Sequence, residues 1–320
     1  MSILIYAESA DGKLKKVAFE LASYAKKVAE SWGTTVTAVT INNSNTSELA
    51  TYGVDKVICA AHSDLDKFNA RNYAEVVQQA AKKENSTLVV LSATTDSLYI
   101  APMLSVFLGA GFASNVVSLP TSQSPLRLKR TAFSNKAFVV SELNNSCNVI
   151  SLAKNSFGLF PSTGAATQEN FVPTLSATAS KVEVTGVEKS TGKVTIADAD
   201  IVVSAGRGLK GPENWGMIEE LASVLGAATA CSKPVSDLGW RSHSEHVGQT
   251  GKPVATNLYI AIGISGAIQH IAGVNSSKVK VVINTDPEAP FFKVADYGVV
   301  GDAFEVVPQL IEKLKAFKAQ

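Results

Sequence analysis

The order of strand and helix signals in the first forty residues decides the fold class. The chain begins with SILIYAE (residues 2–8), LKKVAFELASYAKKVAESW (residues 14–32) and TVTAVTI (residues 35–41). In the second of these segments, Val17, Leu21, Tyr24 and Val28 recur at the spacing of one helix face. A buried strand, an amphipathic helix and a β-branched strand in this order predict a right-handed βαβ unit and a parallel sheet.

The same alternation continues to about residue 94 and then changes. YGVDKVICAA (52–61) and TLVVLSAT (87–94) have the pattern of strands, and NARNYAEVVQQAAKKENS (69–86) that of a helix. Between 126 and 195 the strand-like segments are LRLKRTAFSNKAFVVSEL (126–143), NVISLA (148–153) and SKVEVTGVEKS (180–190). With few helical signals among them, the sheet is expected to end in an antiparallel or edge portion. Residues 160–180, rich in Ser, Thr, Ala and Pro, predict an extended loop.

The last third of the chain starts a new α/β pattern. The strand-like segments are DIVVSAGRGL (200–209), NLYIAIGI (257–264) and VKVVINTD (279–286), and the helical ones are 213–227 and 265–274. Residues 303–317 close the chain as a strand or a terminal helix. We therefore expect an α/β protein of two domains, residues 1–195 and 196–320. Each should have a mainly parallel sheet flanked by helices, and the second should be Rossmann-like.

Composition excludes several classes of protein. The 320 residues carry a net charge of +1, are 46% hydrophobic and 18% charged, and include three cysteines. Such a balanced charge gives no electrostatic footprint for nucleic acid or a membrane surface. Cys59, Cys147 and Cys231 lack metal-ligand spacing, so buried free thiols in a reducing compartment are expected. With no signal-peptide pattern and no 18-residue apolar run, we expect a bacterial cytoplasmic protein without membrane insertion.

A glycine-rich turn follows the first strand of the last third. GRGLKG (206–211) fits the G-x-G-x-x-G pattern of dinucleotide-binding turns. The acid that would bind the ribose should follow about 20 residues later, but AATACSKP (227–234) has no carboxylate. Pro212 and Glu213 also delay the helix. An NAD-dependent oxidoreductase built on this turn is therefore the weaker alternative, while an anion-binding turn with Arg207, or a plain tight turn, stays open.

A second stretch, EHVGQTGKPVA (245–255), has the glycines and lysine of a phosphate loop but not their spacing. His246 stands where the first glycine of a Walker loop belongs, and Pro253 replaces its Ser or Thr. The stretch therefore lacks both the phosphate-binding arrangement of the lysine and the hydroxyl that would bind Mg²⁺, which argues against NTP hydrolysis. What is left is a turn around Thr250 that could present an amide and a hydroxyl to a flat heterocycle, or a simple surface turn.

Further polar turns follow the remaining strands. In GISGAIQHIAG (263–273), Ser265 could cap a helix whose free N–H groups face a phosphate. His270 lies one turn further on, where a histidine by default has a structural role. Asn284 ends the next strand and Asp302 follows the one after it. The carboxyl ends of parallel strands share one edge, so these turns are expected to converge there.

Four stretches together resemble one family. SAGRGLKGPENW (204–215), HVGQTGK (246–252), IAIGISGAIQHIAG (260–273) and INTDPEAPFFKVADYGVVGD (283–302) look like the alpha subunit of the electron transfer flavoproteins. The detailed match covers about residues 200–310. The N-terminal half agrees in pattern only, including a Tyr-Ala-Glu at residues 6–8.

The resemblance implies FAD in the C-terminal domain, with no catalytic residue and no metal ligand. The cofactor-binding residues carried over are Arg207, Ser232, Lys233, Val247, Gly248, Gln249, Thr250, Ser265, Gly266, Ala267, Ile268, Gln269, His270, Asn284, Asp302 and Ala303. By the same resemblance, Thr250 hydrogen-bonds flavin N5 and His270 lies near O2. Asn284 and Asp302 hold the adenosine end, and Ser265 faces the pyrophosphate.

The resemblance also implies partners. Family members pair with a beta subunit, which usually holds AMP and which the N-terminal domain of this chain would contact. They carry electrons from flavoprotein dehydrogenases, such as acyl-CoA dehydrogenase of fatty acid oxidation, to a quinone oxidoreductase without substrate turnover of their own. A subunit that has lost its cofactor is the third reading, and the complete set of C-terminal turns argues against it.

One position departs from the family pattern. Relatives usually have Ser-Arg, with the guanidinium over the flavin ring, where this chain has Ser232-Lys233. Lysine keeps the charge but loses the planar stack. His246 likewise stands where relatives often have Gln. These substitutions are expected to change the reduction potentials of the flavin rather than its binding.

Overall fold

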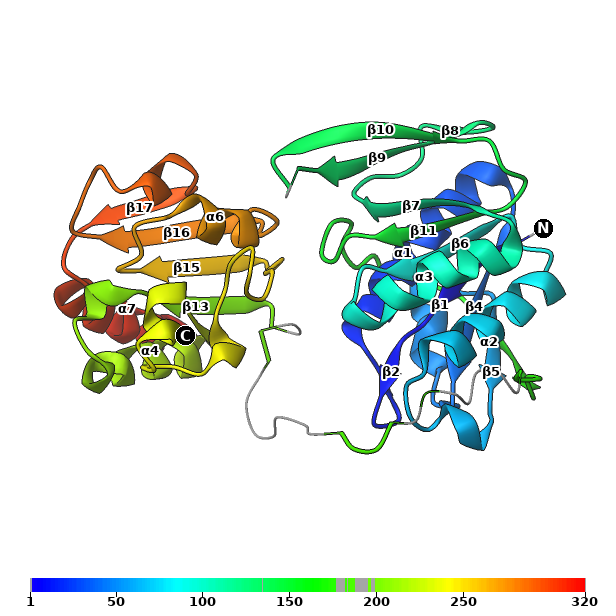
Figure 1. Ribbon diagram of the computed structural model, residues 1–320, viewed down its shortest axis with the longest axis horizontal. Coiled ribbons are helices and arrows are strands. Elements are labelled where there is room, and N and C mark those ends of the chain that lie inside the picture. The colour runs from blue at the N-terminus through cyan, green and yellow to red at the C-terminus, as the bar shows by residue number, and fades with distance from the viewer. Residues whose placement is uncertain are drawn as a thin grey trace. The chain divides into compact units, whose positions relative to one another are not determined.

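The computed structural model describes residues 2–133, 135–176, 182, 184–187, 195–196 and 199–319. The chain divides into two compact units (Figure 1). The first comprises Met1–Ala132 and Phe138–Val187, and the second Phe133–Ala137 and Glu188–Gln320. The domain boundary predicted at residue 195 falls among residues that are mostly outside the described part of the chain, and it stays a prediction.

The first unit is built on one large sheet with the strand order β10-β9-β7-β11-β6-β1-β4-β5-β12, and β8 pairs with β9. The strands are β1 (Ser2–Tyr6), β4 (Thr35–Ile41), β5 (Lys56–Ala60), β6 (Leu88–Ser92), β7 (Gly111–Val116), β8 (Ser122–Gln123), β9 (Leu126–Ala132), β10 (Ala137–Leu143), β11 (Asn148–Leu152) and β12 (Thr167–Phe171). The short strands β2 (Ser9–Ala10) and β3 (Lys13–Leu14) form a separate hairpin. The helices are α1 (Lys16–Trp32), α2 (Ala70–Lys83) and α3 (Thr95–Leu108).

Most of this sheet is parallel, as the sequence predicts. Seven neighbouring strands, in the order β7-β11-β6-β1-β4-β5-β12, pair in parallel. In contrast, β9 pairs antiparallel with β7 and β8. The antiparallel portion predicted from residues 126–143 is therefore confirmed. NVISLA was grouped with that portion, but as β11 it lies between β6 and β7 in the parallel part. The predicted loop at 160–180 contains the edge strand β12, and most of the strand predicted at 180–190 lies outside the described residues.

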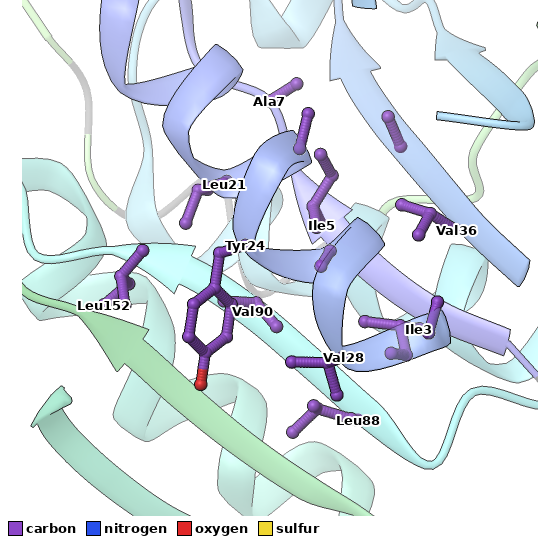
Figure 2. Packing of buried hydrophobic residues seen from close by; sticks show 14 of the residues in the cluster. Ile3, Ile5, Ala7, Leu21, Tyr24, Val28, Val36, Leu88, Val90 and Leu152 are labelled. Atoms are coloured by element: carbon purple, nitrogen blue, oxygen red, sulfur yellow. The ribbon is translucent and has the colours of Figure 1, made fainter. Parts of the chain in front are cut away.

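Helices cover both faces of this sheet, which explains the unbroken apolar run at the start of the chain. Ile3 and Ile5 pack in a cluster with α1, and Leu4 and Tyr6 pack in a second cluster with α2 and α3. Figure 2 shows the first cluster, in which the Tyr24 ring of α1 lies among aliphatic side chains of the strands. A strand buried on both faces needs an apolar residue at every position, not at every second one.

The second unit has a five-stranded parallel sheet with the order β14-β13-β15-β16-β17. Its strands are β13 (Ile201–Ala205), β14 (Ala228–Cys231), β15 (Leu258–Ile262), β16 (Val279–Asn284) and β17 (Tyr297–Val300), and its helices are α4 (Gly216–Leu225), α5 (Lys233–Asp237), α6 (Ile268–Val274) and α7 (Ala303–Lys318). The side chains of α4 and α7 join one hydrophobic cluster and those of α6 the other, so the sheet is covered on both faces (Figure 1).

The strand order of the second unit defines where a ligand would bind. From β13 the chain goes first to β14 on one side, and then to β15, β16 and β17 on the other. The direction therefore reverses between β13 and β15. In doubly wound sheets of this order, ligands bind at that switch point, outside the carboxyl ends of the strands.

Candidate functional site

Two glycine turns meet backbone to backbone at the switch point. Gly206 follows β13, and its N–H donates to the carbonyl of Ile262 at 2.9 Å. The N–H of Gly208 donates to the carbonyl of Gly263, which follows β15, at 3.1 Å. Gly263 has φ 60°, a conformation in which an L-residue is strained. The helix α4 starts only at Gly216, after two 3₁₀ turns, and not directly behind the glycines as the dinucleotide fingerprint requires.

The ends of β16 and β17 complete this edge. Asn284, the last residue of β16, donates from Nδ2 to the carbonyl of Ile264 at 3.1 Å, which ties two neighbouring turns together. Asp302 follows β17 and caps α7, because its Oδ1 accepts from the N–H of Phe304 at 2.9 Å. Lys210 lies 3.8 Å from Oδ2 of Asp302 and 4.8 Å from the centre of the Phe304 ring. Lys210 was not among the predicted site residues.

The loop Val247–Thr250 is docked on α6 through its backbone. The N–H of Val247 donates to the carbonyl of Cys231, the last residue of β14, at 3.0 Å. The N–H of Gln249 donates to the carbonyl of Gln269 at 2.8 Å. A β-carbon on Gly273 would lie 2.5 Å from the α-carbon of Gly248. The loop is therefore brought from sequence positions between β14 and β15 to the same edge as the glycine turns.

The capping function predicted for Ser265 is wrong. The helix α6 begins at Ile268, its N-cap residue is Ala267, and no side chain caps it. Gly266 has φ 90° and Ala267 is extended, so the regular helix cannot start at Ser265. Ser265 itself is exposed, and its carbonyl accepts from the N–H of Phe291 at 3.0 Å. The backbone of this turn still lies at the carboxyl end of β15.

His270 points into the protein interior. Its side chain is 7% exposed, and Nε2 lies 2.8 Å from the hydroxyl oxygen of Tyr259. Both rings contact Phe291. Nδ1 is enclosed and has no hydrogen-bond partner among the described residues. Burial, and to a smaller extent the charge of His246, lowers the pKa of His270 to about 4. The ring is therefore neutral at pH 7.

Ser232 and Lys233 follow β14. The N–H of Ser232 donates to the carbonyl of Ala205 at 3.1 Å, which joins the ends of β14 and β13. Lys233 is the first residue of α5 and is exposed, as is Arg207 in the turn after β13. All sixteen predicted residues thus lie in segments at the carboxyl edge of the second sheet. Their contact with a cofactor stays a prediction.

The described residues offer little for metal or nucleophilic chemistry. No group of His, Cys, Asp or Glu among them could hold a metal ion. Cys59 and Cys231 are buried free thiols, as predicted, and Cys147 is partly buried. Burial raises the pKa of Cys231 to about 12, which keeps it protonated.

Within the described part of the chain, no helix is both long enough and apolar enough to cross a bilayer.

Comparisons with known proteins decide the family. Residues 3–187 match the family model of the electron transfer flavoprotein domain, and residues 195–275 that of the electron transfer flavoprotein FAD-binding domain. An electron transfer flavoprotein subunit alpha of Thermoanaerobacterium thermosaccharolyticum is 35% identical over 99% of this chain and 98% of its own length. The chain belongs to the family of electron transfer flavoprotein alpha subunits. The subunit alpha of Bacillus subtilis is also 35% identical, over 98% of this chain and 97% of that protein.

Membership confirms the resemblance read from the four stretches, and it fits the two α/β units. A Clostridium saccharobutylicum protein called Protein FixB is 32% identical over 98% of this alpha subunit and 96% of its own length. Sequence reasoning missed three residues that contact the predicted site residues: Tyr259 contacts His270, Gly273 packs on Gly248, and Lys210 lies beside Asp302. A tyrosine inside an apolar strand and a glycine inside a helix were the available signals, because each is unusual at such a position.

Proposed function

We propose that this alpha subunit binds one FAD at the carboxyl edge of its second sheet and carries electrons as part of a heterodimer with a beta subunit. The observation that supports this best is the convergence of the glycine turns after β13 and β15 with the loop 247–250 at the switch point. The match of residues 195–275 to an FAD-binding domain covers the same turns. Bound FAD supplies the redox chemistry, and the chain binds and orients it.

The residues present fit an adenine dinucleotide. A β-carbon at Gly208 or Gly266 would collide with the backbone of a neighbouring turn, so these turns carry no side chain and a pyrophosphate can approach their backbone closely. Arg207 and Lys233 are exposed cations beside them. In the proposed site Ser265, Asn284 and the start of α7 contact the adenylate half and Val247–Thr250 the flavin, and Ser232 lines the cofactor beside Lys233.

Within the flavin half, we propose that the Thr250 hydroxyl hydrogen-bonds N5 of the flavin and that the turn of α6 with His270 lies near O2. A hydrogen bond that changes strength on reduction shifts the potential of a cofactor. The enclosed, neutral His270 acts on O2 by holding Ala267 and Gln269 in place, because its own nitrogens are turned inward in this structure.

The proposed partners follow the family. A beta subunit, holding AMP, would contact the first unit. Electrons would come from flavoprotein dehydrogenases such as acyl-CoA dehydrogenase and pass to a quinone oxidoreductase in the bacterial cytoplasm, with no substrate turnover by the subunit itself. For the NAD-dependent alternative, the turn at 206–211 lacks both the directly following helix and the ribose-binding acid.

Co-expression with its beta partner tests the proposal. The purified complex should be yellow, show the absorption bands of a flavin and bleach with dithionite. Thr250→Ala should keep FAD but change the reductive titration, and Thr250→Ser should restore it because the hydroxyl is kept. A complex that stays colourless after FAD is added, or one that oxidises NADH with a simple substrate, would contradict the proposal.

A further inference from the structure

The buried pair Tyr259 and His270 connects the centre of the second sheet to the candidate flavin site. Tyr259 lies in β15 and is fully buried, and its ring stacks on Phe291 with a centroid distance of 6.3 Å. Its hydroxyl is 2.8 Å from Nε2 of His270, at the start of α6. No sequence motif required a tyrosine at this position.

The proton on this hydrogen bond can be placed from the surroundings of the two rings. Burial raises the pKa of Tyr259 above its usual value, and burial lowers that of His270. Both groups are therefore neutral, and the neutral imidazole has one donor and one acceptor nitrogen. The Tyr259 contact is the one hydrogen bond of the His270 ring among the described residues, because Nδ1 has no partner there. A phenol is a stronger acid than the N–H of a neutral imidazole, so the Tyr259 hydroxyl donates and Nε2 accepts, which leaves the ring proton on Nδ1.

His270 is also coupled to the loop that carries the predicted flavin contacts. The residue before it, Gln269, accepts the N–H of Gln249 at 2.8 Å. Three residues after it, Gly273 packs directly on Gly248 and accepts the N–H of Val254 at 2.8 Å. The loop is therefore docked on the backbone of α6 on either side of His270, and the His270 side chain ties this same part of α6 to Tyr259 of β15.

From these contacts we infer that Tyr259 is a positioning residue of the flavin site. Its hydroxyl donates to Nε2 of His270, fixes the ring as the Nδ1–H tautomer and holds in place the first turn of α6, on which the loop Val247–Thr250 is docked. Tyr259 touches neither the flavin nor a substrate. The inference goes one step beyond the proposed function and rests on it for the effect on the cofactor, but not for the effect on His270.

The test uses the full chain in complex with its beta partner and with ¹⁵N-labelled histidine. Nitrogen NMR distinguishes the two neutral tautomers, and His270 is identified among the four histidines of the chain by the signals that are lost in His270→Gln. The wild-type protein should show Nδ1–H. In Tyr259→Phe this tautomer should lose its dominance, the flavin potentials should shift, and FAD should bind at most about tenfold more weakly.

Tyr24 provides the matched control. It is a fully buried tyrosine of the first unit (Figure 2). Its hydroxyl donates to the carbonyl of Ser118 at 3.2 Å. Tyr24→Phe should lose a similar amount of stability but leave the His270 tautomer and the flavin potentials unchanged. Any shift of the potentials in this control would mean that a general loss of stability explains the Tyr259 effect, which would overturn the inference.

Two further outcomes decide between this inference and the proposed function. A wild-type Nε2–H tautomer overturns the inference even if Tyr259→Phe does not fold, and so does a variant with unchanged tautomer and potentials. A wild-type complex that binds no FAD overturns the proposed function, while the tautomer measurement still decides whether Tyr259 sets the state of His270.

Discussion

A β-carbon placed on Gly208 would lie 2.6 Å from the α-carbon of Gly263. These two residues belong to turns that leave the carboxyl ends of β13 and β15, on either side of the switch point. The turns are held in contact by the hydrogen bond from the Gly208 N–H to the Gly263 carbonyl. The bare backbones at this crossing set the shape of the crevice in which the dinucleotide is proposed to lie.

Gly208→Ala should destabilise the second unit by about 1–3 kcal/mol, because the added methyl group meets backbone that cannot move aside. Urea unfolding gives the free energy, and FAD titration should show a parallel loss of affinity. Gly216→Ala is the matched control: Gly216 is helical, and nothing lies within 4 Å of its β-carbon position. That variant should be neutral or up to about 1 kcal/mol more stable. Equal stability of the two variants would contradict the steric argument.

Asp302 combines a helix cap with a place in the candidate site, and two substitutions separate these functions. Asp302→Ala removes the acceptor for the Phe304 N–H and should cost about 1 kcal/mol of stability. Asp302→Asn keeps a capping oxygen and should cost much less. If Asp302 binds the adenosine end through its charge, both variants should weaken FAD binding. Full FAD affinity in the asparagine variant would show that the residue acts only as a cap.

The layers of the fold could be predicted from the sequence because apolar periodicity reports burial directly. SILIY has no polar position, and as β1 it is covered by helices on both faces. The position of later strands in the sheet could not be predicted in this way. NVISL is as apolar as β1, but nothing in it says that β11 inserts between β6 and β7. Pairing partners depend on long-range contacts that periodicity does not encode.

The same limit applies to the candidate site. The rule that turns after parallel strands share one edge was sufficient to bring Arg207, Asn284 and Asp302 together. It was not sufficient for Ser265, because a left-handed Gly266 moves the start of α6 to Ile268. Nor did it show the direction of the His270 side chain, which depends on the partner Tyr259 eleven residues earlier in the chain.

Lys233→Arg tests the departure from the family pattern. Lys233 is exposed at the start of α5, so a longer planar side chain can be accommodated there. A guanidinium stacked on the flavin ring would add about 0.5–1 kcal/mol of interaction that depends on the redox state, and should shift the flavin potentials. Lys252→Arg, an exposed position in a neighbouring turn, should leave them unchanged. Dithionite titration with a reference dye measures both, and identical potentials in the Lys233 variant and the wild type would exclude the stacking effect.

The buried His270 should make the second unit sensitive to acid. Its pKa is about 4 in the folded chain against an ordinary value of 6.5. Between these two values the unfolded state binds a proton that the folded state does not. The unfolding free energy should therefore fall as the pH drops from about 6.5 to about 4, by about 3 kcal/mol in total, and be insensitive to this group above pH 7. Burial also lowers the pKa of His246, which acts in the same direction.

His270→Gln isolates this contribution, since carboxylates that titrate in the same range are present in both proteins. Urea unfolding followed through Trp215 and Trp240 of the second unit, in a Trp32→Phe background, gives the unfolding free energy at pH 7, 5.5 and 4.5. At pH 7 the variant should be less stable than the wild type because it loses the contact with Tyr259. Its deficit should shrink as the pH falls, because only the wild type carries the unfavourable protonation. His62→Gln is the matched control, because it changes the first unit, which Trp215 and Trp240 do not report, and it should leave their unfolding transition unchanged. A constant difference between His270→Gln and the wild type would show that His270 has the same pKa in the folded and the unfolded chain, which would contradict the effect of burial on this ring.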